Sequence, residues 1–316
     1  MRIVVATPAS RGSHKGNRVT ALRWAGHLRA LGHRVRLVDE WDGQPGDVLV
    51  ALHATKSHPS AARWRARRPD APLIVSMAGT DLYQDLPASA EARRSLALAT
   101  RITVLQPLGI EALPAEFRSR ARAIVQSARA VPPLPAPSGV FQACLLAHLR
   151  AVKDPCLAAA ALRRLPARSR LRVVHLGAPL DPGSAERARA AMAEEPRYSW
   201  RGDRPRREAL GTLAGSAIAL VTSRLEGGSN AVSEALAAGV PVLSTRVDGS
   251  VGVLGPAYPG LFPAGDAEAL ARLLLRVEED EAFLASLRAW VARLRPLVEP
   301  AREREAWRAL LAEVAP

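Results

Sequence analysis

The chain has 316 residues, of which 48% are hydrophobic, and its 44 Lys and Arg against 30 Asp and Glu give a formal net charge of +14. This length predicts two domains that each bury a core, and the apolar fraction excludes an intrinsically disordered chain. The same composition excludes collagen, coiled coils and small disulfide-bonded scaffolds.

The two cysteines, Cys144 and Cys156, offer no disulfide framework and no metal-ligand spacing with nearby histidines. We expect buried thiols, no metal and no cofactor. The longest weakly polar runs, Ala214–Thr222 and Ala235–Thr245, are shorter than the ~20 residues that cross a bilayer. Ile3–Ala6 is likewise shorter than a signal-peptide core. The sequence therefore predicts a soluble, cytoplasmic protein with no membrane span.

The basic residues are almost all arginines, because Lys15, Lys56 and Lys153 are the only lysines. They are scattered along the whole chain, and aromatic residues make up only 4% of it. A nucleic-acid-binding surface would gather its cations on one face and interleave aromatic side chains for stacking. We expect most of these arginines to lie on solvated helix faces, with no nucleic-acid partner. Binding of anionic ligands or nucleic acid is the alternative.

Short apolar runs alternate with amphipathic segments, which is the pattern of strands and crossover helices in a parallel sheet. In the first half, the expected strands are Arg2–Ala6, Val35–Val38, Val48–Leu52, Leu73–Met77 and Ile102–Leu105. Asn17–Leu31 is the expected first helix, and Gly32 ends it in the left-handed conformation. Residues 1–130 are thus predicted to form a Rossmann-like, doubly wound domain.

A proline-rich segment divides the chain, because Ala130–Gly139 holds four prolines and neither a helix nor a central strand can pass through it. We expect a linker at 131–139. After it, the expected strands are Val140–Ala147, Leu171–Leu176, Ala217–Val221 and Val240–Ser244, and the expected helices are Pro155–Leu165, Ser184–Glu194, Pro205–Leu213, Asn230–Ala238 and Ala267–Glu279. These form a second Rossmann-like domain at 140–295. A last helix, Glu299–Glu313, within 296–316, is expected to return to the first domain.

Two such domains are expected to face a cleft, with function on the loops at the carboxyl ends of the strands. The most informative loop is Gly227-Gly228-Ser229-Asn230, which joins a buried strand to a helix. Its glycines let a ligand approach the backbone, and the helix start offers free N–H groups, so the loop predicts a site for an anion or a phosphate.

Two glutamates flank this loop. Glu226 and Glu234 are eight residues apart, about 12 Å along a continuous helix, so they are expected to meet different parts of a ligand. Glu234 is expected to lie off the buried stripe of its helix, where it accepts hydrogen bonds from vicinal hydroxyls of a sugar. The alternative is an ordinary surface glutamate.

The pattern Ser-x-x-Glu-Gly…Glu-Ala-x-Ala-x-Gly-x-Pro-Val, with Glu226 and Glu234 as its acids, resembles the signature of retaining GT-B glycosyltransferases of the sucrose-synthase-like group. The resemblance implies the α/β GT-B fold and a nucleotide-sugar donor. It also implies that Glu226 lies close to the transferred sugar, that the helix N-terminus binds the diphosphate, and that Glu234 holds the ribose hydroxyls.

The same group has an Arg and a Lys on the diphosphate, five residues apart, after the first strand of the second domain. Lys153 matches the lysine, but His148 stands where the arginine is usual. Arg150 is a candidate for the missing cation, because a leaving diphosphate develops negative charge that side chains and helix dipoles neutralise. The alternative is a solvated arginine, and the choice between His148 and Arg150 stays open.

The first domain offers candidates for an acceptor site. Lys15, Arg18 and the amides of Gly16 and Asn17 direct positive charge to the loop after the first strand, which suits a small anion better than a neutral hydroxyl. Further candidates follow two other strands: His53 and Asp81, either of which could orient or deprotonate an acceptor, and Thr80 beside Asp81. The alternative for His53 is a structural histidine.

Three longer stretches, Gly16–Trp24, Gly79–Tyr83 and His148–Pro155, resemble the selenosugar synthases of selenoneine biosynthesis. This resemblance covers nearly the whole chain, with least support in Glu186–Tyr198 and after Asp280. It implies UDP-N-acetylglucosamine or a related UDP-sugar as the donor, selenophosphate as the acceptor and a 1-selenosugar as the product. Such an acceptor agrees with the cations of the first domain.

Two other functions stay open. One is a GT-B glycosyltransferase with a hydroxyl or lipid-linked acceptor, for which the Arg-rich segment Arg63–Arg68 is the one candidate for a membrane-facing helix. The other is a basic nucleic-acid-binding protein that keeps a transferase fold without turnover. The sugar, the anomeric outcome, the need for a general base and the oligomeric state are not fixed by the sequence.

Overall fold

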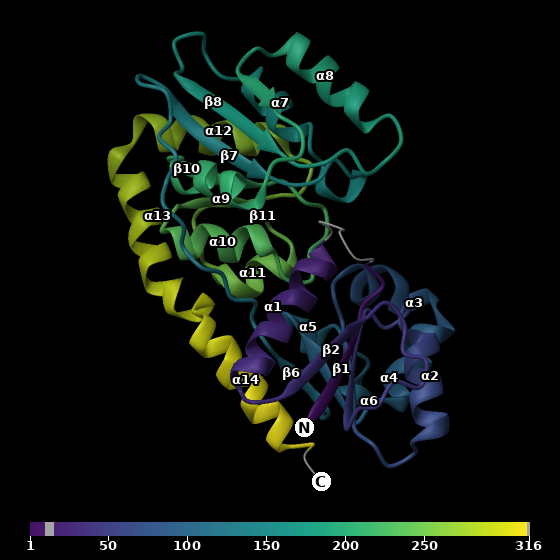
Figure 1. Ribbon diagram of the computed structural model, residues 1–316. Coiled ribbons are helices and arrows are strands. Elements are labelled where there is room, and N and C mark those ends of the chain that lie inside the picture. Colours follow the sequence, from purple (N-terminus) through teal and green to yellow (C-terminus); the bar gives the residue numbers. More distant parts are fainter. Residues whose placement is uncertain (10–15, 315–316) are drawn as a thin grey trace. The chain divides into compact units, whose positions relative to one another are not determined.

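The computed structural model describes residues 1–9 and 16–314, which fold into two compact units. The first unit comprises Met1–Gln126 together with the segment from Pro300 onward, and the second comprises Ser127–Glu299 (Figure 1). Within the described residues, each unit is built on one six-stranded sheet whose neighbouring strands are all parallel. The predicted α/β fold class is therefore confirmed.

The first unit orders its strands β2-β1-β3-β4-β5-β6. They are β1 (Arg2–Ala6), β2 (Arg34–Val38), β3 (Val48–Leu52), β4 (Leu73–Ser76), β5 (Arg101–Val104) and β6 (Ala121–Ala123), and the helical segments are α1 (Gly16–Ala30), α2 (His58–Arg67), the π-helix η1 (Asp81–Asp85), α3 (Leu86–Ala88), α4 (Ala90–Leu98), α5 (Leu108–Glu111), α6 (Ala115–Arg118) and α14 (Pro300–Ala312). The strand order reverses between β1 and β3, which is the switch point where a doubly wound sheet opens a crevice.

The C-terminal helix α14 packs beside α1 on one face of this sheet (Figure 1). Trp24 and Trp307 meet there edge to face, with ring centroids 5.0 Å apart. The buried carboxylate of Glu303 accepts hydrogen bonds from Trp24 Nε1 at 2.9 Å and from His27 Nε2 at 3.1 Å. The predicted return of the last helix to the first domain is thus confirmed. A second core, around Trp41 and Trp64, fills the opposite face.

The second unit orders its strands β12-β11-β10-β7-β8-β9, the doubly wound order of dinucleotide-binding folds. They are β7 (Phe141–Leu146), β8 (Leu171–Leu176), β9 (Tyr198–Trp200), β10 (Ile218–Val221), β11 (Val242–Thr245) and β12 (Leu261–Phe262), and the helical segments are the 3₁₀ turn η2 (Ala151–Lys153), α7 (Leu157–Leu162), α8 (Ser184–Glu194), α9 (Arg206–Ala214), α10 (Asn230–Ala238), α11 (Asp248–Leu254), α12 (Ala267–Glu279), α13 (Glu281–Leu294) and the 3₁₀ turn η3 (Arg295–Val298). The switch point here lies between β7 and β10.

The proline-rich segment lies on the surface of the second unit, in contact with α9 and the turn after it. Leu134 donates its N–H to the Gly211 carbonyl at 2.8 Å, and its backbone lies so close to Gly215 that a Cβ there would meet the Leu134 oxygen at 1.7 Å. The segment therefore belongs to the second unit, whose boundary falls between Gln126 and Ser127, earlier than the expected linker. Missing proline donors do not prevent this packing, because Leu134 supplies the N–H.

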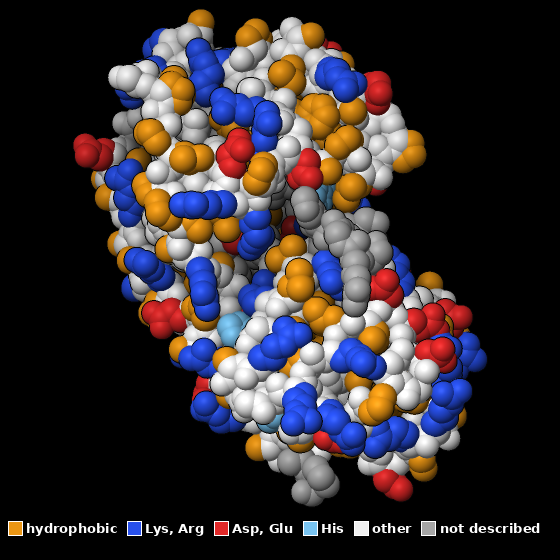
Figure 2. Space-filling view, viewed as in Figure 1, with side chains coloured by type: hydrophobic (Ala, Val, Ile, Leu, Met, Phe, Trp, Pro, Cys, Tyr) orange, Lys and Arg blue, Asp and Glu red, His pale blue; other side chains and the backbone are white. Residues whose placement is uncertain are grey.

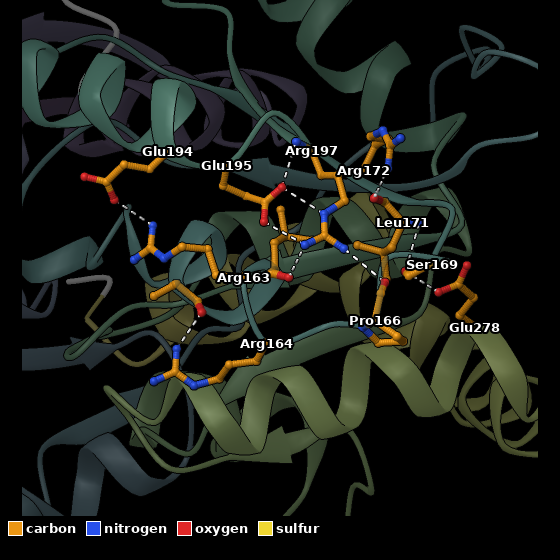
Figure 3. A network of polar contacts seen from close by, with 12 residues as sticks. Arg163, Arg164, Pro166, Ser169, Leu171, Arg172, Glu194, Glu195, Arg197 and Glu278 are labelled. Carbon is orange, nitrogen blue, oxygen red and sulfur yellow. Dashed lines mark hydrogen bonds and ion pairs between the residues drawn. The ribbon is translucent and has the colours of Figure 1, made fainter.

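A polar network lies at the amino edge of the second sheet (Figure 3). The Arg197 guanidinium donates to both carboxylate oxygens of Glu195, at 2.8 and 2.7 Å, and to the Leu162 carbonyl at 2.6 Å. Ser169 Oγ donates to Glu278 Oε2 at 2.5 Å. We call these residues the amino-edge network. It fastens the end of α7 and the starts of β8 and β9, on the edge opposite the strand ends where ligands bind.

The arginines are distributed over the visible face of each unit and are interspersed with acidic side chains (Figure 2). Several bind backbone or stack on rings: Arg65 donates to the Leu98 carbonyl at 2.8 Å, and the Arg68 guanidinium lies 4.7 Å from the Trp64 ring centroid. None of the helices in the described ranges combines the length and apolar character that crossing a bilayer requires.

Candidate functional site

The switch point of the second sheet brings together two loops that the sequence singled out. The loop after β7 carries His148, Arg150 and Lys153, and the loop after β10 carries Glu226. Because β7 and β10 are hydrogen-bonded neighbours and run parallel, their carboxyl ends open at the same place. A crevice at this place is where doubly wound sheets bind their ligands.

Lys153 and Glu226 meet there. Lys153 Nζ donates to Glu226 Oε1 at 2.6 Å, and Ser223 Oγ donates to the same oxygen at 2.6 Å. The glutamate side chain is 9% exposed and the lysine side chain 28%. An ammonium group has three N–H donors, so Lys153 keeps donors for a further anion while it neutralises the carboxylate. We call Lys153, Ser223 and Glu226 the acid–lysine cluster.

Neighbouring backbone holds this cluster in place. Thr222 Oγ1 donates to the Lys153 carbonyl at 2.8 Å, and Arg224 N–H donates to the Val152 carbonyl at 2.8 Å, which ties the β10 loop to the η2 turn. On the other side, α11 approaches the Glu226 backbone closely. Gly249 makes the approach possible, because a Cβ there would lie 2.3 Å from the Glu226 carbonyl oxygen.

The helix α10 begins at Asn230, directly after the glycine pair. Ser229 is its N-cap, and its side chain accepts the Val232 N–H at 3.4 Å. The positive end of the helix dipole therefore lies three residues beyond Gly227, four beyond Glu226 in sequence. Gly227 is buried and Gly228 half-buried. The predicted strand, loop and helix are all present, and Gly239 ends α10 in the left-handed conformation as a helix C-cap.

Glu234 differs from its expected surroundings. It is 8% exposed rather than off the buried stripe, because every side chain from Val232 to Ala237 is buried. The sequence pattern assumed one buried helix face, whereas α10 is covered by α9 as well as by the sheet. Glu234 Oε1 accepts a hydrogen bond from Arg206 Nη2, at the start of α9, at 2.6 Å.

The two candidates for the second diphosphate cation have different surroundings. His148 is half-buried, and its Nδ1 accepts the Ala178 N–H at 3.0 Å, so a neutral His148 carries its proton on Nε2. Arg150 is 45% exposed and lies 3.9 Å from Asp181. His148 therefore offers an N–H donor and Arg150 a full charge on a loosely held side chain. Both assignments stay predictions.

In the first unit, His53 ends β3 at its switch point and is 2% exposed, with a positive φ of 77°. Lys56 N–H lies 3.3 Å from His53 Nδ1, and Thr80 Oγ1 lies 3.3 Å from Nε2. Burial lowers the pKa of His53, so the ring is neutral at pH 7 with its proton on Nε2. This geometry favours orienting a ligand through the N–H over abstracting a proton.

Asp81 is fully buried, and backbone donors surround its carboxylate. Oδ1 accepts N–H groups from Ala78 and Gly79 at 2.7 and 2.8 Å, and Oδ2 accepts that of Ala54 at 2.8 Å. Asp81 thereby joins the loops that follow β3 and β4. With these three backbone donors its carboxylate favours the orienting role over the deprotonating one, and the role of Asp81 stays a prediction.

The remaining acceptor candidates begin α1. Gly16 is exposed, and Asn17 and Arg18 are half-buried in the first turn of this helix. Within residues 1–9 and 16–314, Arg18 has no ion-pair partner. Lys15 lies outside the described residues.

Several residues that shape these sites were not predicted from the sequence. Ser223 is the serine of the pattern Ser-x-x-Glu, and its spacing from Glu226 was the signal for the hydrogen bond between them. Gly249 and Arg206 lie 23 and 28 residues from the glutamates they contact. Tertiary packing brings Gly249 and Arg206 to these glutamates, so no local sequence pattern could have predicted the two contacts.

Comparison with known proteins gives one family match. Residues 142–280 match the model of the family described as glycosyl transferases group 1. This stretch runs from β7 to the end of α12 and contains Lys153, Glu226 and Glu234. No curated protein matches the sequence.

Three solved structures have a similar fold over the whole chain. HepE from Anabaena, in complex with UDP and glucose, is 16% identical with a TM-score of 0.77 over 99% of both chains. Sucrose-phosphate synthase from Thermosynechococcus elongatus is 15% identical with a TM-score of 0.78 over 98% of this chain and 99% of that one. An E. coli structure described as trehalose-6-phosphate bound with UDP-2-fluoro glucose is 12% identical with a TM-score of 0.76 over 100% of both. These similarities confirm the two-domain GT-B fold.

Proposed function

We propose that this chain is a UDP-sugar glycosyltransferase of the GT-B type. The observation that carries the proposal is the acid–lysine cluster, with Lys153 Nζ 2.6 Å from Glu226 at the switch point of the second sheet, beside the start of α10. The glycosyltransferase family match covers this unit. Structural neighbours include HepE complexes with UDP and with UDP-glucose, which supports UDP as the nucleotide.

The donor is assigned to the second unit. The diphosphate is held by Lys153, by His148 or Arg150, and by the amides at Ser229 and Asn230, so the chain's own cations and a helix dipole neutralise the leaving group. Glu234 accepts the ribose hydroxyls. Glu226 faces the transferred sugar and stabilises positive charge that develops at C1.

The acceptor is assigned to the first unit, and we propose that it is selenophosphate. Lys15, Arg18 and the amides of Gly16 and Asn17 hold the phosphate group, and the Thr80 and His53 pair orients it. The selenium lone pair forms the bond to C1 while the bond from C1 to the diphosphate oxygen breaks and UDP keeps its electron pair. Water then cleaves the selenium–phosphorus bond, which gives a 1-selenosugar and inorganic phosphate. We propose N-acetylglucosamine as the sugar, on the sequence resemblance alone.

The test is to incubate purified protein with UDP-N-acetylglucosamine, UDP-glucose and UDP-galactose, each with selenophosphate, with hydroxyl acceptors in its place, and with no acceptor. UDP release and a selenium-containing sugar are followed by mass spectrometry. Selenophosphate-dependent UDP release supports the whole proposal, and release with hydroxyl acceptors alone would replace the acceptor. No UDP release with any sugar would refute the transferase. Arg18→Ala should raise the KM of selenophosphate more than that of the donor.

A lipid-linked acceptor receives less support from the structure. The candidate membrane-facing segment, Arg63–Arg68, belongs to α2, whose apolar side chains Ala61 and Trp64 are buried inside the unit. Arg65 is engaged with backbone carbonyls rather than left for anionic lipid.

A further inference from the structure

Glu234 has a charged partner that no sequence pattern indicated. Arg206 Nη2 donates to Glu234 Oε1 at 2.6 Å, and the carboxylate side chain is 8% exposed while the arginine side chain is 53% exposed. The buried Glu234 carboxylate thus accepts a charged hydrogen bond from an arginine that extends inward from the surface. Of the arginines around the start of α9, Arg204 lies near Glu208 instead, at 3.7 Å, and the described residues give Arg207 no ion-pair partner.

Helix geometry explains why Arg206 makes this contact. Pro205 stands at the N-cap with an extended ψ of 135°, so α9 starts abruptly at Arg206. The helix then runs along α10, and its first side chain lies beside the second turn of α10. Arg207, one position further on, points about 100° away around the helix.

We propose that Arg206 is a positioning residue for ribose recognition, an inference that rests on the proposed function. A carboxylate has about four lone-pair positions, and one guanidinium N–H occupies one of them. The others can accept both hydroxyls of a ribose, provided that the carboxylate keeps its orientation. Arg206 secures this condition, because its charge-assisted hydrogen bond fixes Oε1.

The consequence is selectivity for ribonucleotides over deoxyribonucleotides. A 2′-deoxyribose leaves the buried carboxylate without one of its donors, and an unpaired buried polar group is costly. The wild-type protein should therefore bind UDP about tenfold or more tightly than 2′-deoxy-UDP. When Arg206 is removed, the carboxylate is free to rotate, and this preference should fall.

The test compares UDP with 2′-deoxy-UDP by isothermal titration calorimetry. Arg206→Ala should reduce the preference for UDP to within about threefold and leave the affinity for 2′-deoxy-UDP nearly unchanged. Arg206→Lys should recover part of the preference, and Arg207→Ala, the matched control, should retain all of it. The double variant R206A/E234Q should lose no more of the preference for UDP than E234Q alone, because the two residues act as one unit.

The outcomes separate this inference from the proposed function. If the wild-type protein binds no UDP, both fail. If it binds UDP with a ribose preference that Arg206→Ala leaves intact, only the role of Arg206 fails. Equal weakening of both nucleotides in Arg206→Ala, with an unchanged thermal midpoint, would mean that Arg206 attracts phosphate rather than positions Glu234, and this also overturns the inference.

Discussion

The two edges of the second sheet each hold a short ion pair, but the pairs differ in what they leave available. At the amino edge, Arg197 donates to both oxygens of Glu195 and to the Leu162 and Pro166 carbonyls (Figure 3). The hydrogen bonds from Arg197 lower the pKa of Glu195. All three nitrogens of this guanidinium thus donate to groups inside the fold.

At the carboxyl edge, Lys153 makes a contact of similar length with Glu226, yet an ammonium group with three donors keeps capacity for another acceptor. This edge is also where the strand order reverses and a ligand can enter. The comparison indicates that distance alone does not separate a structural ion pair from a functional one. We expect a functional pair to be marked by unused hydrogen-bonding capacity at a switch point.

The largest effect is expected when the carboxyl-edge cation is removed. Lys153→Ala should lower kcat/KM for the UDP-sugar by about 100- to 1,000-fold, because the leaving diphosphate loses a charged donor. Steady-state UDP release by the folded variant measures the effect. Stability should also fall, because the variant leaves the buried Glu226 carboxylate without its cation. Arg163→Ala is the control, since it removes an exposed cation paired with Glu194. Equal losses in both variants would contradict the assignment.

Removing the amino-edge cation should lower stability and leave activity intact. Arg197→Ala leaves the largely buried Glu195 carboxylate uncompensated and frees the Leu162 carbonyl, so the free energy of unfolding should fall by about 3 kcal/mol. Urea denaturation measures this loss. The kcat/KM of the folded variant should equal that of the wild type. A variant as stable as the wild type, or one that is stable but inactive, would remove the distinction between the two edges.

Longer strands were easier to predict from the sequence than strands of two or three residues. The bounds of β3 and β8 were predicted correctly. Burial on both faces makes β3 a continuous apolar run, and apolar residues occupy four of the six positions of β8. The strands β6, β9 and β12 were missed because two or three residues carry no periodicity. Helix α13 was missed because one residue, Asp280, separates it from α12 and caps its start.

The site was predictable where it is local in sequence. Glu226, the glycine pair and Ser229 lie on one strand–loop–helix segment, so their spacing largely fixes their placement. The partners of these residues were not predictable in the same way. Arg206 reaches Glu234 through the packing of α9 on α10, and the backbone bonds of Asp81 depend on where two loops meet.

His175, a buried histidine near the carboxyl end of β8, is expected to have a purely structural role. His175 Nε2 donates to the Ala147 carbonyl at 2.8 Å, and Nδ1 accepts the Tyr198 hydroxyl proton at 2.6 Å, so both ring nitrogens are in use. Burial lowers the pKa of His175 from 6.5 to about 4. Between these values the unfolded chain binds a proton that the folded chain does not, so stability is lost as the pH falls.

The expected size of this loss is about 2 kcal/mol between pH 7 and pH 5. Calorimetric unfolding of the wild type and of His175→Gln across this range measures the loss. On acidification, the free energy of unfolding of the variant should fall by about 2 kcal/mol less than that of the wild type. His58→Gln is the comparison: burial lowers the pKa of this half-buried histidine too, so its removal should reduce the pH dependence less than His175→Gln does. Identical pH dependence in the wild type and His175→Gln would show that His175 is not neutral in the folded protein.

The smallest effect concerns two helix N-caps in the second unit. The Ser229 side chain accepts the Val232 N–H at the start of α10, and the Asp266 side chain accepts the Ala269 N–H at the start of α12. Replacing either by Ala should cost about 1 kcal/mol of stability, since each cap satisfies one helix donor. Only Ser229→Ala should also weaken UDP binding, by about fivefold, because it loosens the helix turn assigned to the diphosphate. Calorimetric titration with UDP measures this difference. If Asp266→Ala weakened UDP binding as much, the effect would come from the stability of the unit and not from the carboxyl edge.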